Sequence, residues 1–539
     1  MSDKPIVLMP EDIQRIMGKD AQRNNITAAK MISEIVKTTL GPKGMDKMLV
    51  SPTNDIVITN DGATILKEMQ IEHPAAKMMV EIAKTQEIEV GDGTTSAVMI
   101  AGKLLDNAEK LLDKKIHPTV IVKGYRLACE KAQEILKEIS IKIPIENNEY
   151  LRQIAMTAMT GKGAEDSKEK LSDIIVEAIQ QLRDNLKVDL NDIKIEKIKG
   201  EGIGDTQLIS GVVFDKEKTS YDMPSVVDNA RIALIDFPIE IKSPDIKTEV
   251  SISSPQQLQS FILQEENSIK EMVQSIKDSG ANVIFCQKGI DDFASFLLAK
   301  SRIYACRRVS RSDMEKLSKA TGAKIINNLN DLTEFDLGEA GVVEQIKTGE
   351  DKLTYVRGCR NPKALTILIR GGTDHILDEV ERAIADGLGD VSCALKNGLI
   401  VPGGGAVEIE LSKRLRNFGQ SLSGREQLAV EEFASALEFI PITLAENAGI
   451  DPIDTLTELK SRHDSGERNA GLNLFENKIV DVLESKIIEP SKIKSQAISS
   501  ATEVATMILR IDDVIASKPD KKGRMNFEGT RPDYMSGLE

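Results

Sequence analysis

Apolar residues near the start of the chain recur every three or four positions, which is the period of an amphipathic helix. Between Asp12 and Leu40 these positions are Ile13, Ile16, Met17, Ala28, Met31, Ile32, Ile35, Val36 and Leu40. Gly41-Pro42 follows at once. We expect this pair to end the helix, because glycine supplies a left-handed cap and proline prevents continuation.

The same period returns further along this first part of the chain. A short alternating run, "DIVITND", predicts a strand, and a helical stretch follows its turn. A second long apolar face consists of Val98, Ala101, Leu104, Leu105, Ala108, Leu111 and Leu112. His117-Pro118 predicts the start of the next helix, because proline is tolerated in a first turn. Residues 1 to about 144 are therefore predicted to be mostly helical.

The middle of the chain changes to short β-rich runs separated by helical patterns, which is typical of an α/β domain. We place this domain at about residues 214–365. Inside it, residues 255–278 show a helical stripe formed by Leu258, Phe261, Ile262, Ile269, Met272, Val273 and Ile276. Upstream, two alternating runs predict paired strands with Gly200–Gly204 as their hairpin turn. After Val401 helical patterns return and continue to about Ser517.

Composition limits the class of protein. A chain of 539 residues with 41% hydrophobic and 29% charged residues predicts two or three globular domains. The formal net charge of −15 argues against binding to nucleic acid or anionic membranes, which attract clustered Lys and Arg. We see neither a signal peptide nor a run long enough to span a bilayer, and the five cysteines are scattered singly. We therefore expect a cytoplasmic protein with reduced thiols and no zinc site.

The stretch "VGDGTTSAV", Val90 to Val98, directly precedes the second long apolar face. A Gly-x-Gly turn lets backbone amides approach an anion, and a helix N-terminus adds unpaired N–H groups and a positive dipole end. Thr94, Thr95 and Ser96 offer hydroxyl groups, and Asp92 could hold Mg²⁺ bound to a polyphosphate. The alternative is an Asx turn with a threonine N-cap and no ligand.

Two other glycine-rich turns could bind an anion in the same way. They are "TLGPKGMDK", Thr39 to Lys47, and "VPGGGAVEIEL", Val401 to Leu411. If all three turns bind one nucleotide, residues 41–44, 91–96 and 403–405 must converge, and the middle of the chain is an insertion into a domain built from both ends. The chain has no P-loop and no protein-kinase signature set.

Two isolated carboxylates are candidates for activating water. Asp61 lies in "TNDGATIL", a strand-to-helix turn, where its local alternative role is an N-cap. Asp386 points away from the apolar stripe of its own helix, so its alternative role is that of an ordinary aspartate on the solvent-exposed face of the helix. Gly387 and Gly389 flank it, and each costs a helix about 1 kcal/mol relative to alanine.

At these residues the chain resembles the group II chaperonins, the family of the archaeal thermosome and eukaryotic TRiC. The resemblance covers residues 10–517 and rests on "TTLGPKGMDKML", "TNDGATIL", "VGDGTTSAV", "MTAMTGKGAE", "VPGGGAVEIEL", "REQLAVEEFASALEFIP", "LAENAGID" and "LRIDDVI", in that order. It implies an ATP-driven chaperone built as two stacked rings of eight or nine identical or sister subunits, which encloses unfolded client proteins under a built-in lid. The sequence looks closer to an archaeal subunit.

The resemblance also implies a multidomain α and α/β fold. The expected limits are 1–144 and 403–520 for a mostly helical equatorial domain, 145–213 and 366–402 for a small α+β intermediate domain, 214–365 for an α/β apical domain with a helical lid protrusion at about 243–278, and 521–539 for a flexible tail. The tail lacks the Gly-Met repeats of many relatives.

The matching motifs indicate which residues of this sequence correspond to the functional residues of the family. The resemblance implies nucleotide contacts from Gly41, Gly93, Thr94, Thr95, Ser96 and Gly404, Mg²⁺ binding by Asp92, water activation by Asp61 and Asp386, a γ-phosphate contact from Lys162, and a ribose contact from Glu489. Locally, Lys162 could be only a surface loop lysine and Glu489 only an acid at a helix start.

Two other functions stay open at this stage. Gly387 and Gly389 stand where the family usually has better helix formers. They leave room for a structural ring paralogue with weak or no ATPase that tunes hetero-oligomeric assembly. The other open function is a small-molecule phosphotransferase, which would need the same kind of phosphate-binding turns.

Overall fold

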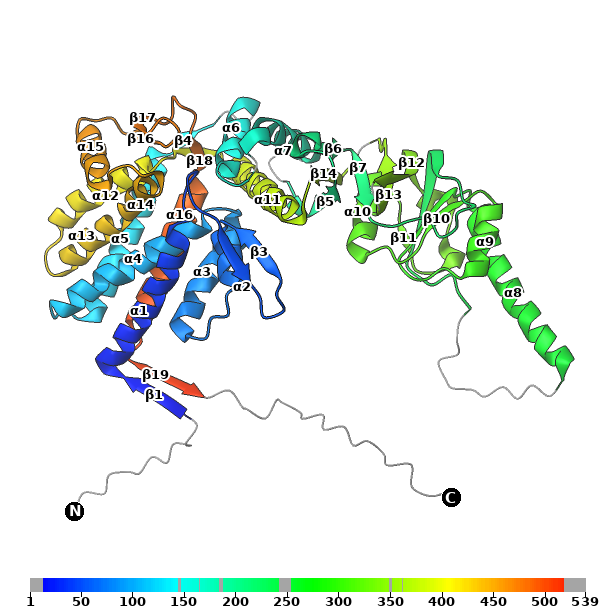
Figure 1. Cartoon of the computed structure of the whole chain (residues 1–539), viewed down its shortest axis with the longest axis horizontal. Helices are drawn as coiled ribbons and strands as arrows, with labels where there is room; N and C mark the ends of the chain where they lie inside the picture. The colour runs from blue at the N-terminus through cyan, green and yellow to red at the C-terminus, as the bar shows by residue number, and fades with distance from the viewer. Residues whose placement is uncertain are drawn as a thin grey trace, which may run out of the picture.

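The computed structural model describes residues 13–143, 147–163, 165–183, 188–241, 254–348, 351–360 and 362–517. Figure 1 shows three parts in an elongated arrangement. We call them the helical part (residues 13–143 and 399–517), the central part (147–209 and 365–397) and the distal part (the described residues between 211 and 360). Within these ranges no helix is long and apolar enough to cross a membrane.

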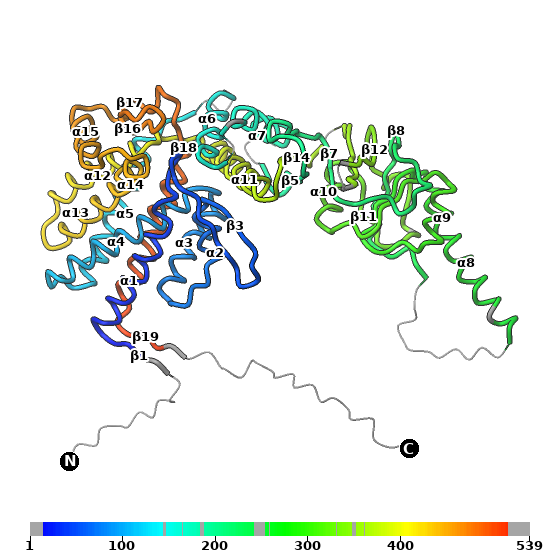
Figure 2. Tube along the Cα trace, viewed as in Figure 1, coloured from blue at the N-terminus to red at the C-terminus, as the bar shows by residue number. Residues whose placement is uncertain are grey.

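The helical part is built from both ends of the chain, which Figure 2 shows as blue and orange-to-red segments lying together. Its helices are α1 (Gly18–Lys37), α2 (Gly62–Glu68), α3 (Pro74–Val90), α4 (Thr94–Asp113), α5 (Pro118–Ile139), α12 (Ala406–Ser421), α13 (Glu426–Leu437), α14 (Phe439–Ala448), α15 (Pro452–Asp464) and α16 (Ser491–Leu509). Its strands are β1 (Ile13–Met17), β2 (Lys47–Val50), β3 (Ile56–Thr59), β4 (Ile141–Lys142), β15 (Leu399–Pro402), β16 (Ala470–Asn473), β17 (Lys478–Asp481), β18 (Ile488–Pro490) and β19 (Asp513–Ser517).

Helix α4 lies at the centre of this part and packs against α1, α13 and α16. The apolar face predicted from its spacing is buried, and Leu104 and Leu105 are fully inaccessible to solvent. Burying one leucine side chain contributes about 1.5–3 kcal/mol. One hydrophobic core therefore joins residues 26–136 to residues 401–509. Helix α5 begins at Pro118 with His117 as its N-cap, which confirms that prediction.

The predicted helix from Asp12 to Leu40 is wrong at both ends. Residues 13–17 form β1, which pairs antiparallel with β19, and so the prediction of helix up to Ser517 is also wrong. Gly18 has φ +63°, a left-handed conformation that ends the strand where α1 begins. At the other end α1 stops at Lys37, because Thr38 closes the last turn and the Thr39 hydroxyl donates to the Val36 carbonyl. Gly41 is therefore not the cap of this helix.

The central part has a separate core. It consists of α6 (Asn148–Met159), α7 (Lys168–Leu182), α11 (Asp374–Asn397) and a sheet of β5 (Ile193–Lys199), β14 (Leu365–Gly371) and β6 (Gln207–Ile209) in the order β5-β14-β6. The hairpin predicted around Gly200–Gly204 is wrong, because β14 lies between β5 and β6. Alternation within single strands could not show that a strand from far along the chain separates them.

The distal part is an α/β layer structure. Its sheet has the order β10-β9-β8-β12-β13-β7, with β11 also paired to β8. The strands are β7 (Gly211–Phe214), β8 (Val226–Ile235), β9 (Val283–Cys286), β10 (Tyr304–Cys306), β11 (Ile325–Ile326), β12 (Gly338–Thr348) and β13 (Asp351–Arg357), and the helices are α8 (Pro255–Asp278), α9 (Asp292–Lys300) and α10 (Arg311–Thr321). This confirms the fold class predicted for the middle of the chain.

Helix α8 projects from the far end of the molecule (Figure 1). Ile269, Val273 and Ile276 in its second half are buried against the distal core. In its first half Phe261, Ile262 and Leu263 are 44%, 47% and 50% exposed. The helical stripe is therefore divided between a packed half and an open apolar half. Residues 243–253 of the predicted protrusion and the predicted tail at 521–539 lie outside the described residues.

Candidate functional site

A cavity of about 380 Å³ lies where the helical part meets the central part. All three glycine-rich turns reach it, since its lining includes Gly41, Gly93 and Gly404. Leu40, Ile440, Leu444, Leu472, Leu474 and Ile487 form an apolar wall. The volume is in the range of small-molecule sites, and an apolar wall with convergent polar groups is typical of them.

Two helices begin at this cavity without a side-chain cap. Gly93 precedes α4 and Gly405 precedes α12, and both have φ +80°. A Cβ on Gly93 would lie 2.6 Å from the Ile493 side chain, so only glycine fits there without displacing a neighbour. Because no side chain satisfies their first N–H groups, both helices present donors and positive dipole ends to the cavity. Such ends favour an anion.

The residues predicted as site residues converge with one exception. The cavity is lined by Gly41, Asp61, Asp92, Gly93, Thr94, Thr95, Ser96, Lys162, Gly404 and Glu489. Asp386 is not among the lining residues, but it contacts Lys162. Lys43 of the first glycine-rich turn is not among the lining residues, and its Nζ donates to the Asn477 side chain. The alternative of an Asx turn with a threonine N-cap at Asp92 is wrong, because the N-cap of α4 is Gly93.

Asp61 is fixed by the start of α2. Its carboxylate accepts from Ala63 N at 3.3 Å and Thr64 N at 2.7 Å, which confirms that it is an N-cap. The Thr94 hydroxyl also donates to Asp61 Oδ1 at 3.3 Å. The cap role and the cavity position are therefore compatible, since the same carboxylate orders the turn and faces the start of α4.

Lys162 joins two carboxylates from different elements. Its Nζ lies 2.6 Å from Asp386 Oδ2 and 3.2 Å from Asp92 Oδ1, and its side chain is 17% exposed. Burial alone would lower the pKa of Lys162, but Asp386 and Asp92 outweigh it and raise the pKa well above its ordinary value. Lys162 is therefore a charged bridge in the cavity wall, and the surface-loop alternative is wrong.

Asp386 does not lie on a solvated face, because its side chain is only 16% exposed. Burial raises the pKa of this carboxyl to about 8, the Lys162 ammonium opposes the increase, and Asp92 and Asp61 add to it. The pKa of a general base is best placed near the working pH. Helix α11 is unbroken from Asp374 to Asn397 despite its two inner glycines.

Asp390 is a cavity residue that the sequence reasoning missed. It lies one helical turn after Asp386, it lines the cavity, and it is 2% exposed. No hydrogen bond to its Oδ1 is found in the described part of the chain. Burial raises the pKa of Asp390 well above its ordinary value, and Asp92 adds to the increase. Its spacing of four residues from Asp386 was the available signal, because such residues share a helix face.

Glu489 lines the cavity from β18 and is paired with a lysine that was also missed. Lys494 Nζ lies 2.8 Å from Glu489 Oε2 and 2.9 Å from Glu408 Oε1. Burial raises the pKa of Glu489, and Lys494 opposes that increase. Pro490 is the N-cap of α16, so Glu489 lies in the strand before the helix.

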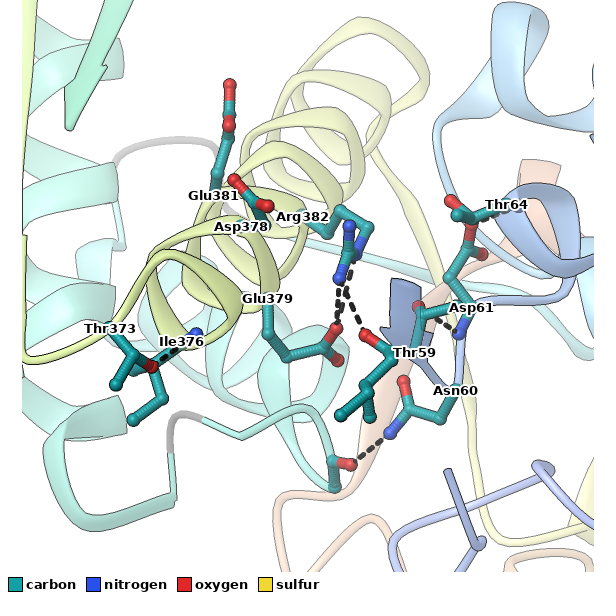
Figure 3. Close-up of polar contacts among 12 residues, drawn as sticks. Thr59, Asn60, Asp61, Thr64, Thr373, Ile376, Asp378, Glu379, Glu381 and Arg382 are labelled. Atoms are coloured by element: carbon teal, nitrogen blue, oxygen red, sulfur yellow. Dashed lines mark hydrogen bonds and ion pairs between the residues drawn. The ribbon is translucent and has the colours of Figure 1, made fainter. Parts of the chain in front are cut away.

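Two contacts hold the central part against the turn that contains Asp61. Figure 3 shows Arg382 of α11 facing this turn, where it donates to the Ile58 carbonyl at 3.1 Å while also contacting Glu379. The Asn60 amide donates to the Gly161 carbonyl at 2.6 Å (Figure 3), and Gly161 directly precedes Lys162 in the sequence. The position of Asp61 relative to Lys162 and Asp386 therefore depends on the contact between the two parts.

The residues present fit a magnesium–nucleotide complex. Mg²⁺ is commonly bound through one or two carboxylates together with substrate phosphates. Asp92 lines the cavity directly before the start of α4, and its side chain is 31% exposed. Across the described ranges no set of three or more His, Cys, Asp or Glu side chains is arranged to hold a metal alone. A cation here would thus depend on ligand oxygens as well as on Asp92.

Comparison with known proteins gives one consistent family. Residues 32–519 match the model of the TCP-1/cpn60 chaperonin family. The chain is 56% identical over 529 residues to a thermosome subunit of Methanocaldococcus jannaschii, covering 97% of this chain and 98% of the relative. It is 54% identical over 538 residues to a thermosome subunit beta of Archaeoglobus fulgidus, with 99% of each chain covered. A solved open-state monomer of a group II chaperonin from Methanococcoides burtonii is similar with a TM-score of 0.59 and 46% identity, covering 78% of this chain and 100% of that one.

Proposed function

The chain belongs to the TCP-1/cpn60 chaperonin family and is of the group II, thermosome type, and from this premise we propose that it is an ATP-dependent chaperone. The observation that carries the proposal is the cavity shared by two parts of the chain. Asp61, Asp92 and the start of α4 come from the helical part, whereas Lys162 and Asp390 come from the central part.

ATP is the ligand that the cavity suits. The uncapped starts of α4 and α12 would bind phosphate oxygens, together with Thr94, Thr95 and Ser96. The apolar wall would accept the base, and Glu489 would accept a hydrogen bond from the ribose. Asp92 would hold Mg²⁺, which supplies charge neutralisation of the phosphates when bound.

Hydrolysis requires a carboxylate that orients water and takes its proton. Asp61 and Asp386 are our candidates, because Asp61 is held rigidly by backbone N–H groups and Asp386 has a pKa raised to about 8. Lys162 would bind a terminal phosphate oxygen in exchange for one of its two carboxylates. Asp92 is the carboxylate exchanged in this scheme, since Mg²⁺ would take it up, and Asp386 would keep its ion pair with Lys162 and accept a proton from water.

Such an exchange would couple hydrolysis to movement of the central part. Lys162 and Asp386 belong to the central part, and the phosphate-binding turns belong to the helical part. A ligand that contacts both stabilises the arrangement in which both can reach it, and so shifts the population between arrangements. The distal part would move with the central part and close the lid.

Client capture is assigned to the distal part. The open apolar half of α8, with Phe261, Ile262 and Leu263, offers a surface to unfolded chains. Closure would withdraw it. The working assembly would be stacked rings of eight or nine identical or sister subunits, in keeping with the alpha and beta thermosome subunits of Archaeoglobus fulgidus.

The alternative, a ring paralogue with weak ATPase, rested on Gly387 and Gly389. Both lie within unbroken α11, where they allow close packing instead of breaking the helix. They therefore no longer favour that alternative.

The test is Asp386→Asn, with Asp378→Asn as its matched control. Asp378 lies on the same helix and forms a surface ion pair with Lys197. We expect Asp386→Asn to lower the turnover of ATP at least 100-fold while nucleotide still binds, and Asp378→Asn to keep it. Phosphate release and nucleotide binding are measured on the same assembled protein. Undiminished turnover in Asp386→Asn would remove Asp386 from the mechanism.

A further inference from the structure

Three elements meet at the Glu489 side of the cavity through one lysine, Lys494, which lines the cavity together with Glu489. Lys494 comes from α16, Glu408 from the first turn of α12, and Glu489 from β18. The ammonium lies 2.9 Å from Glu408 Oε1 and 2.8 Å from Glu489 Oε2. Lys494 is 9% exposed and Glu408 3% exposed, so this contact is nearly closed to water.

The two carboxylates share one positive charge. Lys494 is the sole ion-pair partner of Glu489 among the described residues. A buried ion pair is costly to break, because the partner left behind keeps its charge without compensation. The orientation of the Glu489 carboxylate therefore depends on Lys494.

The second oxygen of Glu489 lies beside the glycine-rich turn at 403–405. A Cβ on Gly403 would lie 3.0 Å from Glu489 Oε1, so this oxygen lies over the glycine-rich turn that lines the cavity. Lys494 thus holds one oxygen of a carboxylate that lines the cavity, while the other oxygen lies beside the glycine-rich turn.

We infer that Lys494 is the positioning residue of Glu489, and that it holds this carboxylate ready to accept a hydrogen bond from a ribose hydroxyl. The inference rests on the proposed binding of a nucleotide. It makes the Lys494–Glu489 ion pair a determinant of sugar recognition, beyond its contribution to packing. Lys494 itself does not need to touch the ligand.

The experiment compares the binding of ATP, 2′-deoxy-ATP and 3′-deoxy-ATP to the assembled full chain at fixed Mg²⁺. A hydrogen bond to a charged group predicts a preference of about tenfold or more for ATP over the analogue that lacks the contacted hydroxyl. The two analogues distinguish the 2′ from the 3′ hydroxyl. We expect Glu489→Gln and Lys494→Met both to reduce this preference to about twofold, and Lys494→Arg to restore most of it.

Lys492→Met is the matched control, because Lys492 lies two residues earlier on α16 and its Nζ donates to Gln496. It should keep the wild-type preference. If Lys494→Met does not fold, Glu408→Gln with Lys494→Met replaces it, since this pair also removes the charge of the buried Glu408 carboxylate. Glu408→Gln alone leaves Lys494 on Glu489 and should keep the preference.

Two results would overturn the inference and leave nucleotide binding in place. One is a Lys494→Met variant that weakens binding of all three nucleotides equally, as expected of a general packing defect or of a direct phosphate contact. The other is an unchanged preference in Lys494→Met when Glu489→Gln has lost it. If the wild-type chain binds none of the three nucleotides, the proposed function itself fails.

Discussion

Gly389 and Gly91 lie with their backbones in contact, at the point where α11 passes the turn between α3 and α4. A Cβ on Gly389 would lie 3.1 Å from Gly91 Cα, and a Cβ on Gly91 would lie 3.1 Å from Gly389 Cα. This contact brings the helix of Asp386 and Asp390 close to Asp92. Gly389, one of the two glycines that weaken α11 locally, is therefore the residue that allows this helix to approach the phosphate-binding turn.

Gly389→Ala and Gly387→Ala should separate the effect of helix weakening from the effect of the close approach between α11 and Gly91. Each gains up to about 1 kcal/mol of helix propensity. At 389 the new methyl group meets backbone, whereas at 387 it meets the terminal methyl of the Ile175 side chain at 2.7 Å, which can rotate away. We expect Gly389→Ala to lower ATP turnover about tenfold and Gly387→Ala to keep it within twofold, with the thermal midpoint of neither variant falling by more than a few degrees.

Turnover and the thermal midpoint are measured on both variants. Equal turnover in the two would mean that the approach of α11 to Gly91 has no bearing on the chemistry.

Much of this fold follows from periodicity. The long helices of the helical part and the alternation of strands and helices in the distal part have strong local patterns, and the structure has them. The β1–β19 pair and the position of β14 between β5 and β6 were missed. Both are pairings between distant segments, which single-segment patterns do not report. The domain limits stay predictions.

The site was predictable where residue type and turn chemistry combine, as at Asp92 and Gly93. Glycine turns that precede helices have few physical uses, and so three of them suggested one anion site. Asp390 and Lys494 were missed because carboxylates and lysines on helices are mostly solvated. Their burial depends on which elements pack above them, and that is decided by tertiary structure. The roles of the cavity residues stay predictions.

Asp390→Asn should stabilise the protein at high pH. Asp390 is 2% exposed, and burial followed by the charge of Asp92 raises its pKa well above the ordinary value. The folded state thus keeps a proton that the unfolded chain loses near pH 4. Stability contributed at low pH is lost as pH rises toward the folded pKa. Asparagine removes this dependence.

We expect Asp390→Asn to raise the free energy of unfolding by about 1–3 kcal/mol at pH 8 and by little at pH 4.5. Urea midpoints at the two pH values measure it, with exposed Asp378→Asn as the control. A gain of equal size at both pH values would contradict the proposed protonation.

Glu410→Gln should weaken the helical part in the opposite pH direction. Glu410 accepts from Arg414 Nε at 2.7 Å, and its Oε2 lies 3.1 Å from His463 Nδ1. Burial acts to raise the pKa of Glu410, but His463 and Arg414 outweigh it and lower the pKa to about 2. This stability is present above the unfolded pKa of about 4.3 and is lost as pH falls toward 2.

The expected loss in Glu410→Gln is about 3 kcal/mol at pH 6, about 1 kcal/mol at pH 2.5, and close to zero only below about pH 2. Thermal midpoints across this range measure it. Glu138→Gln is the control, because Glu138 contacts the same Arg414 at the surface with 63% of its side chain exposed. A pH-independent difference for Glu410→Gln would show that its charge contributes nothing.

Lys162→Met should move the pH profile of ATP hydrolysis to higher pH. A carboxylate base works only when deprotonated, so kcat/KM should rise with pH through the pKa of Asp386, which is about 8. The Lys162 ammonium, 2.6 Å away, holds that pKa down. Removing it should raise the apparent pKa by at least about one unit, which costs about tenfold in kcat/KM at pH 7 and much less at pH 9.

The profile distinguishes an effect on Asp386 from the loss of a phosphate contact. If Lys162 only binds phosphate, Lys162→Met lowers kcat/KM by the same factor at every pH, and the shape of the profile stays that of the wild type. Lys170→Met is the matched control, since Lys170 contacts the Gly204 carbonyl on the surface of the central part. Its profile should superimpose on that of the wild type. A shift of the Lys162→Met profile toward lower pH would show that the two residues do not form the ion pair in the free enzyme, whose groups kcat/KM reports.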